Sequence, residues 1–306
     1  MKSNYLLNSN FMAIVACLLW STAFVGIKIG IQYTPPLQFA GIRFMLSGLI
    51  IFPFIPHKKR IIPSIKKHWK YMSLLALMQT VIHYALFYQG VRLMPSSVSA
   101  IIIGMGPMFV MMVAHFTSDS DKMTKDKLIS VALGIIGVIC VVLGKGGKMA
   151  NTTYLMTVVG VVLLLLTNLN SGFVNVLVKS KTKSMPPLIL TMYTMFVGGV
   201  CLFIMGLLTE GFAGFVFPKP YYYSLAWLSF LSAAAFSLWF TVLQRPEVKV
   251  SEINIWKFLI PVSGALLSWT ILPDESPSIL SLIGMGFTAA ALIWMNFASK
   301  RSKKEV

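Results

Sequence analysis

A lysine stands inside an otherwise apolar run, NIWKFLIP, at residues 254–261. A charged side chain in such surroundings is costly and usually faces water, a partner or a substrate path. Asn254 and Lys257 share a helical face with Pro261, whose ring leaves a backbone carbonyl without its usual donor. Lys257 therefore either binds an anion or gates a path beside a helix break, or extends its long side chain to the lipid headgroups.

A second group of polar and aromatic residues lies in one apolar stretch nearer the N-terminus. Gln79, His83 and Phe87 stand four residues apart, which places them on one face of a helix, and Tyr84 and Tyr88 form an adjacent stripe. His83 lies near the middle of the stretch, where a short side chain cannot reach the headgroups. We expect it to face a cavity; a buried structural hydrogen bond is the alternative.

A third group of polar side chains follows the same logic. Asn168, Ser171 and Asn175 are spaced as i, i+3 and i+7 on one helical face. Because polar groups in a bilayer usually turn toward the bundle interior, we expect them to line the same cavity. Amide side chains at Asn168, Asn170 and Asn175 could instead join helices, an interaction worth about 0.6 kcal/mol on average.

The composition indicates an integral membrane protein. Of the 306 residues, 57% are hydrophobic and only 11% are charged, whereas soluble domains carry roughly 25% charged residues. Ten apolar stretches are long enough to cross a bilayer core of about 30 Å. They cover residues 10–32, 37–56, 70–92, 96–117, 127–144, 153–178, 186–208, 221–243, 250–272 and 278–298. The longest connections, 57–69 and 209–220, are too short to fold as separate domains.

The charge distribution predicts how the chain lies in the membrane. The formal net charge of +17 could indicate a nucleic-acid partner, but the basic residues are concentrated in every second connection and form no single patch. Basic connections stay in the cytoplasm, so both termini are predicted to be cytoplasmic. We expect a lipid bilayer and a small-molecule substrate as partners, and no nucleic acid. The oligomeric state is open.

The chain repeats itself. A constant offset aligns Lys28 with Lys179 and Gly48 with Gly199, and a similar offset aligns Pro107 with Pro261. Five membrane helices, residues 10–147, are thus followed by five similar helices, residues 153–299. Because five is odd, the second repeat enters the membrane from the opposite side. We predict an all-α fold of ten transmembrane helices in two inverted five-helix repeats, with a substrate site near the midplane and alternating access.

The repeat adds aromatic residues to the predicted cavity. It pairs Trp20 with Ser171, Phe24 with Asn175, and His83 with Ser237. Paired positions in a pseudo-symmetric fold face one cavity from opposite sides. We therefore expect the cavity to contain a set of rings that could stack on an aromatic or cationic solute, unless they form interfacial belts. This set is Trp20, Phe24, Tyr84, Tyr88 and Trp239. Arg43 is predicted to be a lipid-phosphate anchor or a second gate charge.

Two segments resemble a known family. LLWSTAFVGIKIGIQYTPPLQFAGIRF and ALFYQGVRLMPSSVSAIIIGMGPMF are similar to the drug/metabolite transporter superfamily, in particular its ten-helix bacterial permeases built from two EamA domains. The chain departs from the pattern where an acidic residue usually closes the fourth helix, because only Asp119 and Asp121 lie nearby. The resemblance implies metabolite transport. Related organic-phosphate carriers use basic residues on the ninth helix, which implies carboxylate recognition by Lys257.

These observations predict an exporter of amino acids or related metabolites in the bacterial inner membrane. A multidrug exporter of aromatic cations is the alternative, and an intramembrane enzyme or an accessory subunit is a further one. Cys17, Cys140 and Cys201 are far apart, so we expect no metal site and no cofactor. No acid lies at the centre of a predicted helix, and His83 is the only such side chain that titrates near neutral pH. We predict facilitated diffusion or weak proton coupling through His83. The substrate and the direction of transport are open.

Overall fold

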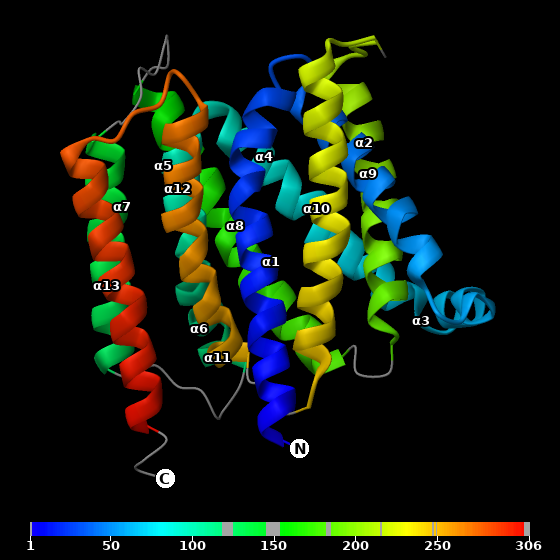
Figure 1. Ribbon diagram of the computed structural model, residues 1–306, viewed down its shortest axis with the longest axis horizontal. Helices are drawn as coiled ribbons and strands as arrows, with labels where there is room; N and C mark the ends of the chain where they lie inside the picture. Colours follow the sequence, from blue (N-terminus) through cyan, green and yellow to red (C-terminus); the bar gives the residue numbers. More distant parts are fainter. Residues whose placement is uncertain are drawn as a thin grey trace.

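The chain folds into a bundle of long helices (Figure 1). The computed structural model describes residues 2–117, 125–144, 154–181, 185–214, 216–246, 248 and 250–302. All regular elements within these residues are helices. This confirms the all-α prediction, and it agrees with the physics of a bilayer, where a helix satisfies its own backbone hydrogen bonds without water.

The helical elements follow one another along the chain with short connections. They are α1 (Lys2–Gly30), α2 (Pro36–Ile51), η1 (Phe52–Phe54), η2 (Lys58–Arg60), α3 (Ile61–Leu75), the π-helical segment η3 (Ala76–Ile82), α4 (His83–Leu93), α5 (Ser96–Gly104), α6 (Gly106–Thr117), α7 (Lys125–Gly144), α8 (Tyr154–Lys181), α9 (Pro187–Glu210), α10 (Lys219–Gln244), α11 (Val250–Asn254), the 3₁₀ turn η4 (Ile255–Phe258), α12 (Leu259–Ile271) and α13 (Ile279–Ser302). Three predicted transmembrane helices are therefore interrupted, at η3, between α5 and α6, and at η4.

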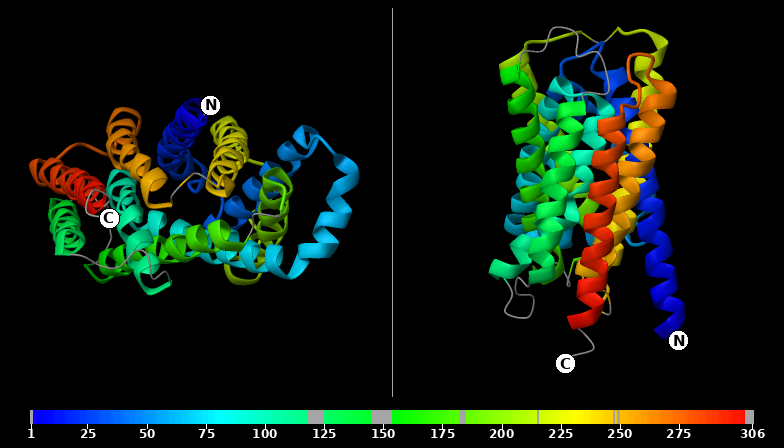
Figure 2. Two further views of the ribbon diagram at one scale, coloured as in Figure 1. Left: turned by 90° about the horizontal axis from the view of Figure 1, so that it is seen from below. Right: turned by 90° about the vertical axis from the view of Figure 1, so that its left-hand side faces the viewer.

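Helical segments occupy all ten predicted stretches. Seven helices in the described part of the chain are long and apolar enough to cross a membrane. Shorter apolar helices occupy Leu128–Gly137, Leu259–Ile271 and Ile279–Ala291. The start of α1 and the end of α13 lie at the same end of the bundle (Figures 1 and 2). The number of crossings and the side that faces the cytoplasm stay predictions.

Large apolar side chains cover the outside of the bundle. Leu155 on α8, Ile204 on α9 and Ile293 on α13 are each at least half exposed. A soluble protein rarely exposes so much contiguous apolar surface. Lipid acyl chains are the natural partners of this surface, as the composition predicts.

The predicted connection at residues 57–69 was wrong. There α3 begins at Ile61 and extends sideways from the bundle before the chain re-enters it (Figures 1 and 2). Pro63 falls in the first turn, where a missing backbone N–H costs little. Lys66 and Trp69 are exposed, whereas Ile61, Met72 and Leu75 are buried. A search for purely apolar stretches overlooks such a two-faced helix.

Helices of the two halves of the chain pack in matching pairs. The equivalent helices α2 and α9 pack together, as do α5 with α12 and α7 with α13. In addition, α1 packs on α10 and α12, while its counterpart α8 packs on α4 and α6. Each contact recurs when the two halves of the chain are exchanged. This is the pattern expected of two halves related by a two-fold axis; the inverted repeat itself stays a prediction.

Glycines allow α2 and α9 to approach closely. A Cβ atom on Gly41 would lie 2.5 Å from the backbone nitrogen of Phe203, and one on Gly199 would lie 2.6 Å from that of Met45. Small residues at a helix crossing let the backbones touch, which is a main source of stability between helices in lipid.

Gly41→Ala should therefore lower the free energy of unfolding, by about 1–3 kcal/mol, because the added methyl group forces the two backbones apart. Gly286→Ala is the control, since a Cβ atom there meets nothing within 4 Å. Thermal unfolding of the purified variants in detergent measures the difference. Equal stability of the two variants would contradict the close packing of α2 and α9.

Candidate functional site

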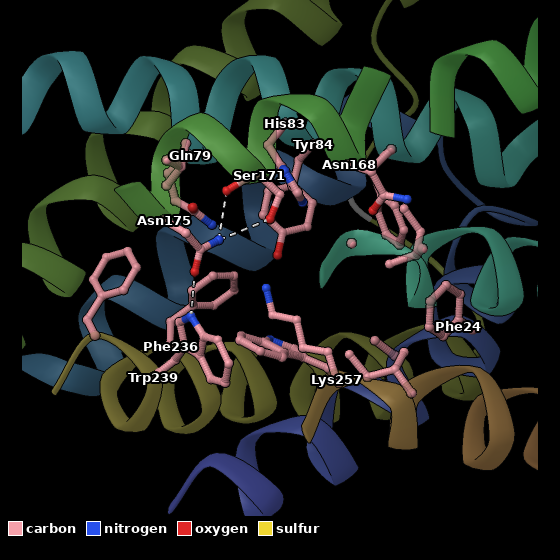
Figure 3. A pocket seen from close by; sticks show the side chains of 18 of the residues that line it. Phe24, Gln79, His83, Tyr84, Asn168, Ser171, Asn175, Phe236, Trp239 and Lys257 are labelled. Atoms are coloured by element: carbon pink, nitrogen blue, oxygen red, sulfur yellow. Dashed lines mark hydrogen bonds between the residues drawn. The ribbon is translucent and has the colours of Figure 1, made fainter. Parts of the chain in front are cut away.

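The cavity near the middle of the bundle is bounded by two walls (Figure 3). One wall comes from α1, α10 and η4, and the other from η3, α4 and α8. The free space inside is about 90 Å³, room for roughly three water molecules. Most of the predicted site residues line it: Trp20, Phe24, Arg43, Gln79, His83, Tyr84, Asn168, Ser171, Asn175, Trp239 and Lys257. That they bind a substrate stays a prediction.

Lys257 points into this cavity. Its side chain is 8% exposed, and Nζ lies 4.7 Å from the ring centroid of Trp239 and 5.9 Å from that of Trp20. Figure 3 shows the ammonium group directed at the opposite wall, which carries His83 and Asn175. The interpretation that Lys257 reaches the lipid headgroups was therefore wrong, because η4 lies on the inner side of the bundle.

Arg43 also lies inside the bundle, at the edge of the cavity. It is 1% exposed. Nη1 donates to the Tyr88 hydroxyl at 2.8 Å, Nε and Nη2 donate to Ser232 Oγ at 3.0 and 2.7 Å, and Nε also lies 3.3 Å from the carbonyl of Leu228. The prediction of a lipid-phosphate anchor was wrong. Arg43 joins α2 to α4 and α10, because a guanidinium group offers five donors in a fixed geometry.

Two predicted residues lie outside the described lining of the cavity. Tyr88 is fully buried and its hydroxyl accepts the bond from Arg43. Asn254 is 1% exposed, and its Nδ2 donates to the carbonyl of Val250, one turn earlier, at 2.8 Å. The expectation that they face the cavity was wrong, because each side chain turns to a partner within the bundle.

The asparagines of α8 satisfy carbonyls on neighbouring helices. Asn168 Nδ2 donates to the carbonyl of Ile102 at 2.7 Å, just before the break between α5 and α6. Asn170 Nδ2 donates to the carbonyl of Met78 in η3 at 2.8 Å. The alternative of joining helices is thus correct for the amide nitrogens of both residues. Asn168 nevertheless also borders the cavity.

Asn175, also on α8, forms hydrogen bonds within the cavity lining. Its Nδ2 donates to the carbonyl and the hydroxyl of Ser171, at 2.7 and 3.3 Å. Its Oδ1 accepts a hydrogen bond of 3.2 Å from Trp239 Nε1 (Figure 3). This bond connects α8 to α10 and therefore joins the two walls.

Two buried polar atoms of the lining lack a partner in the described part of the chain, namely Trp20 Nε1 and His83 Nδ1. Leaving such an atom unsatisfied costs about 1–3 kcal/mol. A water molecule or a polar group of a solute would remove that cost. Among the described lining residues there is no acidic side chain, while Lys257 and Arg43 are basic. The cavity therefore offers positive charge and hydrogen-bonding groups, surrounded by aromatic rings.

Sequence reasoning missed two of these rings. Phe236 lies three residues before Trp239 and packs edge-on against Trp20 at 5.1 Å, and Phe240 also lines the cavity. Their helical spacing around Trp239 was the available signal. The π-helical turn of η3, which carries Gln79, has no evident sequence signal, although such turns are frequent at functional sites.

Comparisons with known proteins agree with this architecture. The model of the EamA-like transporter family matches the chain twice, at residues 7–143 and 158–297. The uncharacterized transporter YvbV of Bacillus subtilis is 27% identical and aligns over 94% of this chain and 90% of its own length. A probable amino-acid metabolite efflux pump of Escherichia coli is 24% identical over 96% of each chain. A crystal structure superposes with a TM-score of 0.72 over 96% of this chain and 98% of that chain, at 13% identity, and shows a shared fold.

Arg43→Lys should lower the free energy of unfolding by about 2–3 kcal/mol, because one ammonium group cannot hold both Tyr88 and Ser232. Tyr88→Phe should cost less, about 1–2 kcal/mol. Thermal unfolding in detergent measures both changes, with Arg60→Lys as the control because Arg60 is exposed. If Arg43→Lys were as stable as Arg60→Lys, the structural role of Arg43 would be wrong.

Proposed function

The chain belongs to the EamA-like transporter family, and from this premise we propose that it exports amino acids or related metabolites across the bacterial inner membrane. The family makes the protein a multi-pass membrane transporter of small molecules and not an enzyme. The name of the Escherichia coli relative, an amino-acid metabolite efflux pump, supports this class of cargo. We propose no nucleic-acid partner.

One observation carries the proposed substrate class: the ammonium group of Lys257 lies in a cavity whose described lining contains no acidic side chain. A carboxylate on the substrate would supply the missing counter-charge. Charge-assisted hydrogen bonds are stronger than neutral ones, especially away from water. Amide and hydroxyl groups at Gln79 and Ser171 would then orient the rest of the solute.

We infer alternating access from the hydrogen bonds that join helices at the two ends of the bundle. At the end away from the termini, Glu210 accepts a hydrogen bond of 3.0 Å from the backbone N–H of Leu37, at the start of α2. Glu275 accepts bonds of 2.5 and 2.8 Å from the N–H groups of Ser96 and Ser97, at the start of α5. A carboxylate at a helix N-terminus is favourable, so these contacts hold that end together.

At the end that carries the termini, a second set of hydrogen bonds joins the helices. Lys179 Nζ donates to the carbonyls of Arg245 and Val248 at 2.8 and 2.6 Å, and Arg245 Nη1 donates to Ser9 Oγ at 2.6 Å. Opening the cavity to one side requires only the hydrogen bonds at that end to break. The predicted inverted repeat, with cytoplasmic termini, describes such a movement.

Lys257→Ala should raise the apparent KM for a carboxylate solute by about thirtyfold or more, because truncating one partner of a buried charge pair costs about 2–5 kcal/mol. The assay is uptake of labelled neutral amino acids by proteoliposomes, with empty liposomes as the blank. Lys219→Ala is the control, since Lys219 is exposed at the start of α10. An unchanged KM would exclude anion recognition by Lys257. Failure of the wild-type protein to transport any of these solutes, with or without a pH gradient, would contradict the substrate class.

His83→Gln tests proton coupling. The imidazole borders the cavity and Nδ1 has no partner among the described residues; Lys257, Arg43 and Tyr84 are the other titratable groups of the described lining. If transport is coupled through His83, the wild-type rate changes across about pH 5–8 and the variant loses that change. The measurement is initial uptake rate against pH, with His57→Gln as an exposed control. A variant that kept the wild-type pH profile would show that His83 does not couple protons to transport.

A further inference from the structure

The aromatic rings near Lys257 form a corner suited to organic cations. Trp20 packs edge-on against Trp239, with ring centroids 5.3 Å apart, and against Phe236 at 5.1 Å. All three rings line the cavity, and Figure 3 labels Phe236 and Trp239 among them. Grouped aromatic faces attract a cation through their quadrupoles, and protein sites for quaternary ammonium ligands are built this way.

In this protein the corner already holds a cation, which is the ammonium group of Lys257 over Trp239 and Trp20. A second internal cation covers another ring, because the Arg43 guanidinium carbon lies 5.8 Å from the centroid of Tyr84. The two differ in how they are held. Arg43 is fixed by hydrogen bonds to Tyr88 and Ser232, whereas the partners of Lys257 in the described part of the chain are the two indole rings.

We propose that Lys257 is a tethered cation that fills this aromatic corner and thereby excludes organic cations from the cavity. Neutralising it would convert the cavity into a binding site for organic cations. The inference rests on the proposed function, because it takes the cavity as the solute site. It also states that one residue, Lys257, determines whether that site accepts anionic or cationic solutes.

One physical effect supports the exclusion. A solute cation in the corner would lie within a few ångströms of the Lys257 ammonium group, in surroundings that screen charge poorly, with no acidic side chain in the described lining to offset the repulsion. A neutral residue at position 257 removes the repulsion from Lys257.

The choice of lysine also suits an anionic solute. Because its ammonium group is held by rings and by no carboxylate of the described residues, Lys257 can leave the corner for a solute carboxylate without breaking a salt bridge among them. Leaving costs only the two cation–π contacts, which are weak beside a buried ion pair. The same residue can therefore reject one class of solute and bind the other.

Binding of benzyltrimethylammonium, measured by isothermal titration calorimetry on protein in detergent, tests the proposal. The variants are Lys257→Gln and Lys257→Met, which keep most of the side-chain volume, with exposed Lys219→Gln as the matched control. We expect both Lys257 variants to bind this cation at least tenfold more tightly than the wild type and the control. Adding Trp239→Leu to Lys257→Gln should abolish the gain.

Thermal unfolding establishes that each variant is folded, and two different substitutions guard against a single misfolded protein. A folded Lys257→Gln or Lys257→Met variant with wild-type cation affinity would overturn the proposal. So would a gain that persists after Trp239→Leu, because the corner would then not be the site. Cation binding is measured without transport, so a failure of amino-acid uptake leaves this result interpretable and the two failures can be told apart.

Discussion

Inside a bilayer there is no water to bond the backbone carbonyls at an irregular place in a helix, and this constraint shapes the centre of the protein. The π-helical turn at η3 and the break between α5 and α6 both interrupt regular helices beside the cavity. Asn170 and Asn168, two residues apart on α8, bond to carbonyls at these two places. Each carbonyl also accepts a backbone N–H, that of Met78 from His83 and that of Ile102 from Met105. The helix that lines one wall thus supplies a second hydrogen bond at each place, where water would do so in solution.

Buried positive charge is accommodated in two different ways. Arg43 uses the planar geometry of its guanidinium group to bond side chains on α4 and α10, and its position is fixed. Lys257 has a compact ammonium group on a flexible stem and rests on aromatic faces. This difference agrees with the general chemistry of the two residues. It separates a structural cation from one that is able to move toward a solute, although both border the same cavity.

Helical periodicity was enough to predict most of the cavity lining, since Gln79, His83 and Asn175 each lie on a face that the packing turns inward. It could not predict which inward side chains bond to other protein groups instead of facing the cavity. Tyr88 is held by Arg43, which joins α2 to α4 and α10, and the Asn254 side chain bends back to its own helix. The pairing of Ser237 with His83 also placed Ser237 wrongly. Ser237 lines a groove on the outside of the bundle, because paired positions do not have the same neighbouring helices.

The walls of the cavity do not coincide with the two halves of the chain. One wall combines α1 from the first half with α10 and η4 from the second, and the other combines η3 and α4 with α8. A movement that opens the cavity therefore separates wall from wall, and the hydrogen bond from Trp239 to Asn175 crosses that boundary. Trp239 is also the ring closest to Lys257. A solute that bonds to Lys257 and Asn175 would disturb the lysine, the ring and the bond between the walls together, so that occupancy of the cavity and the contact between its walls are physically linked.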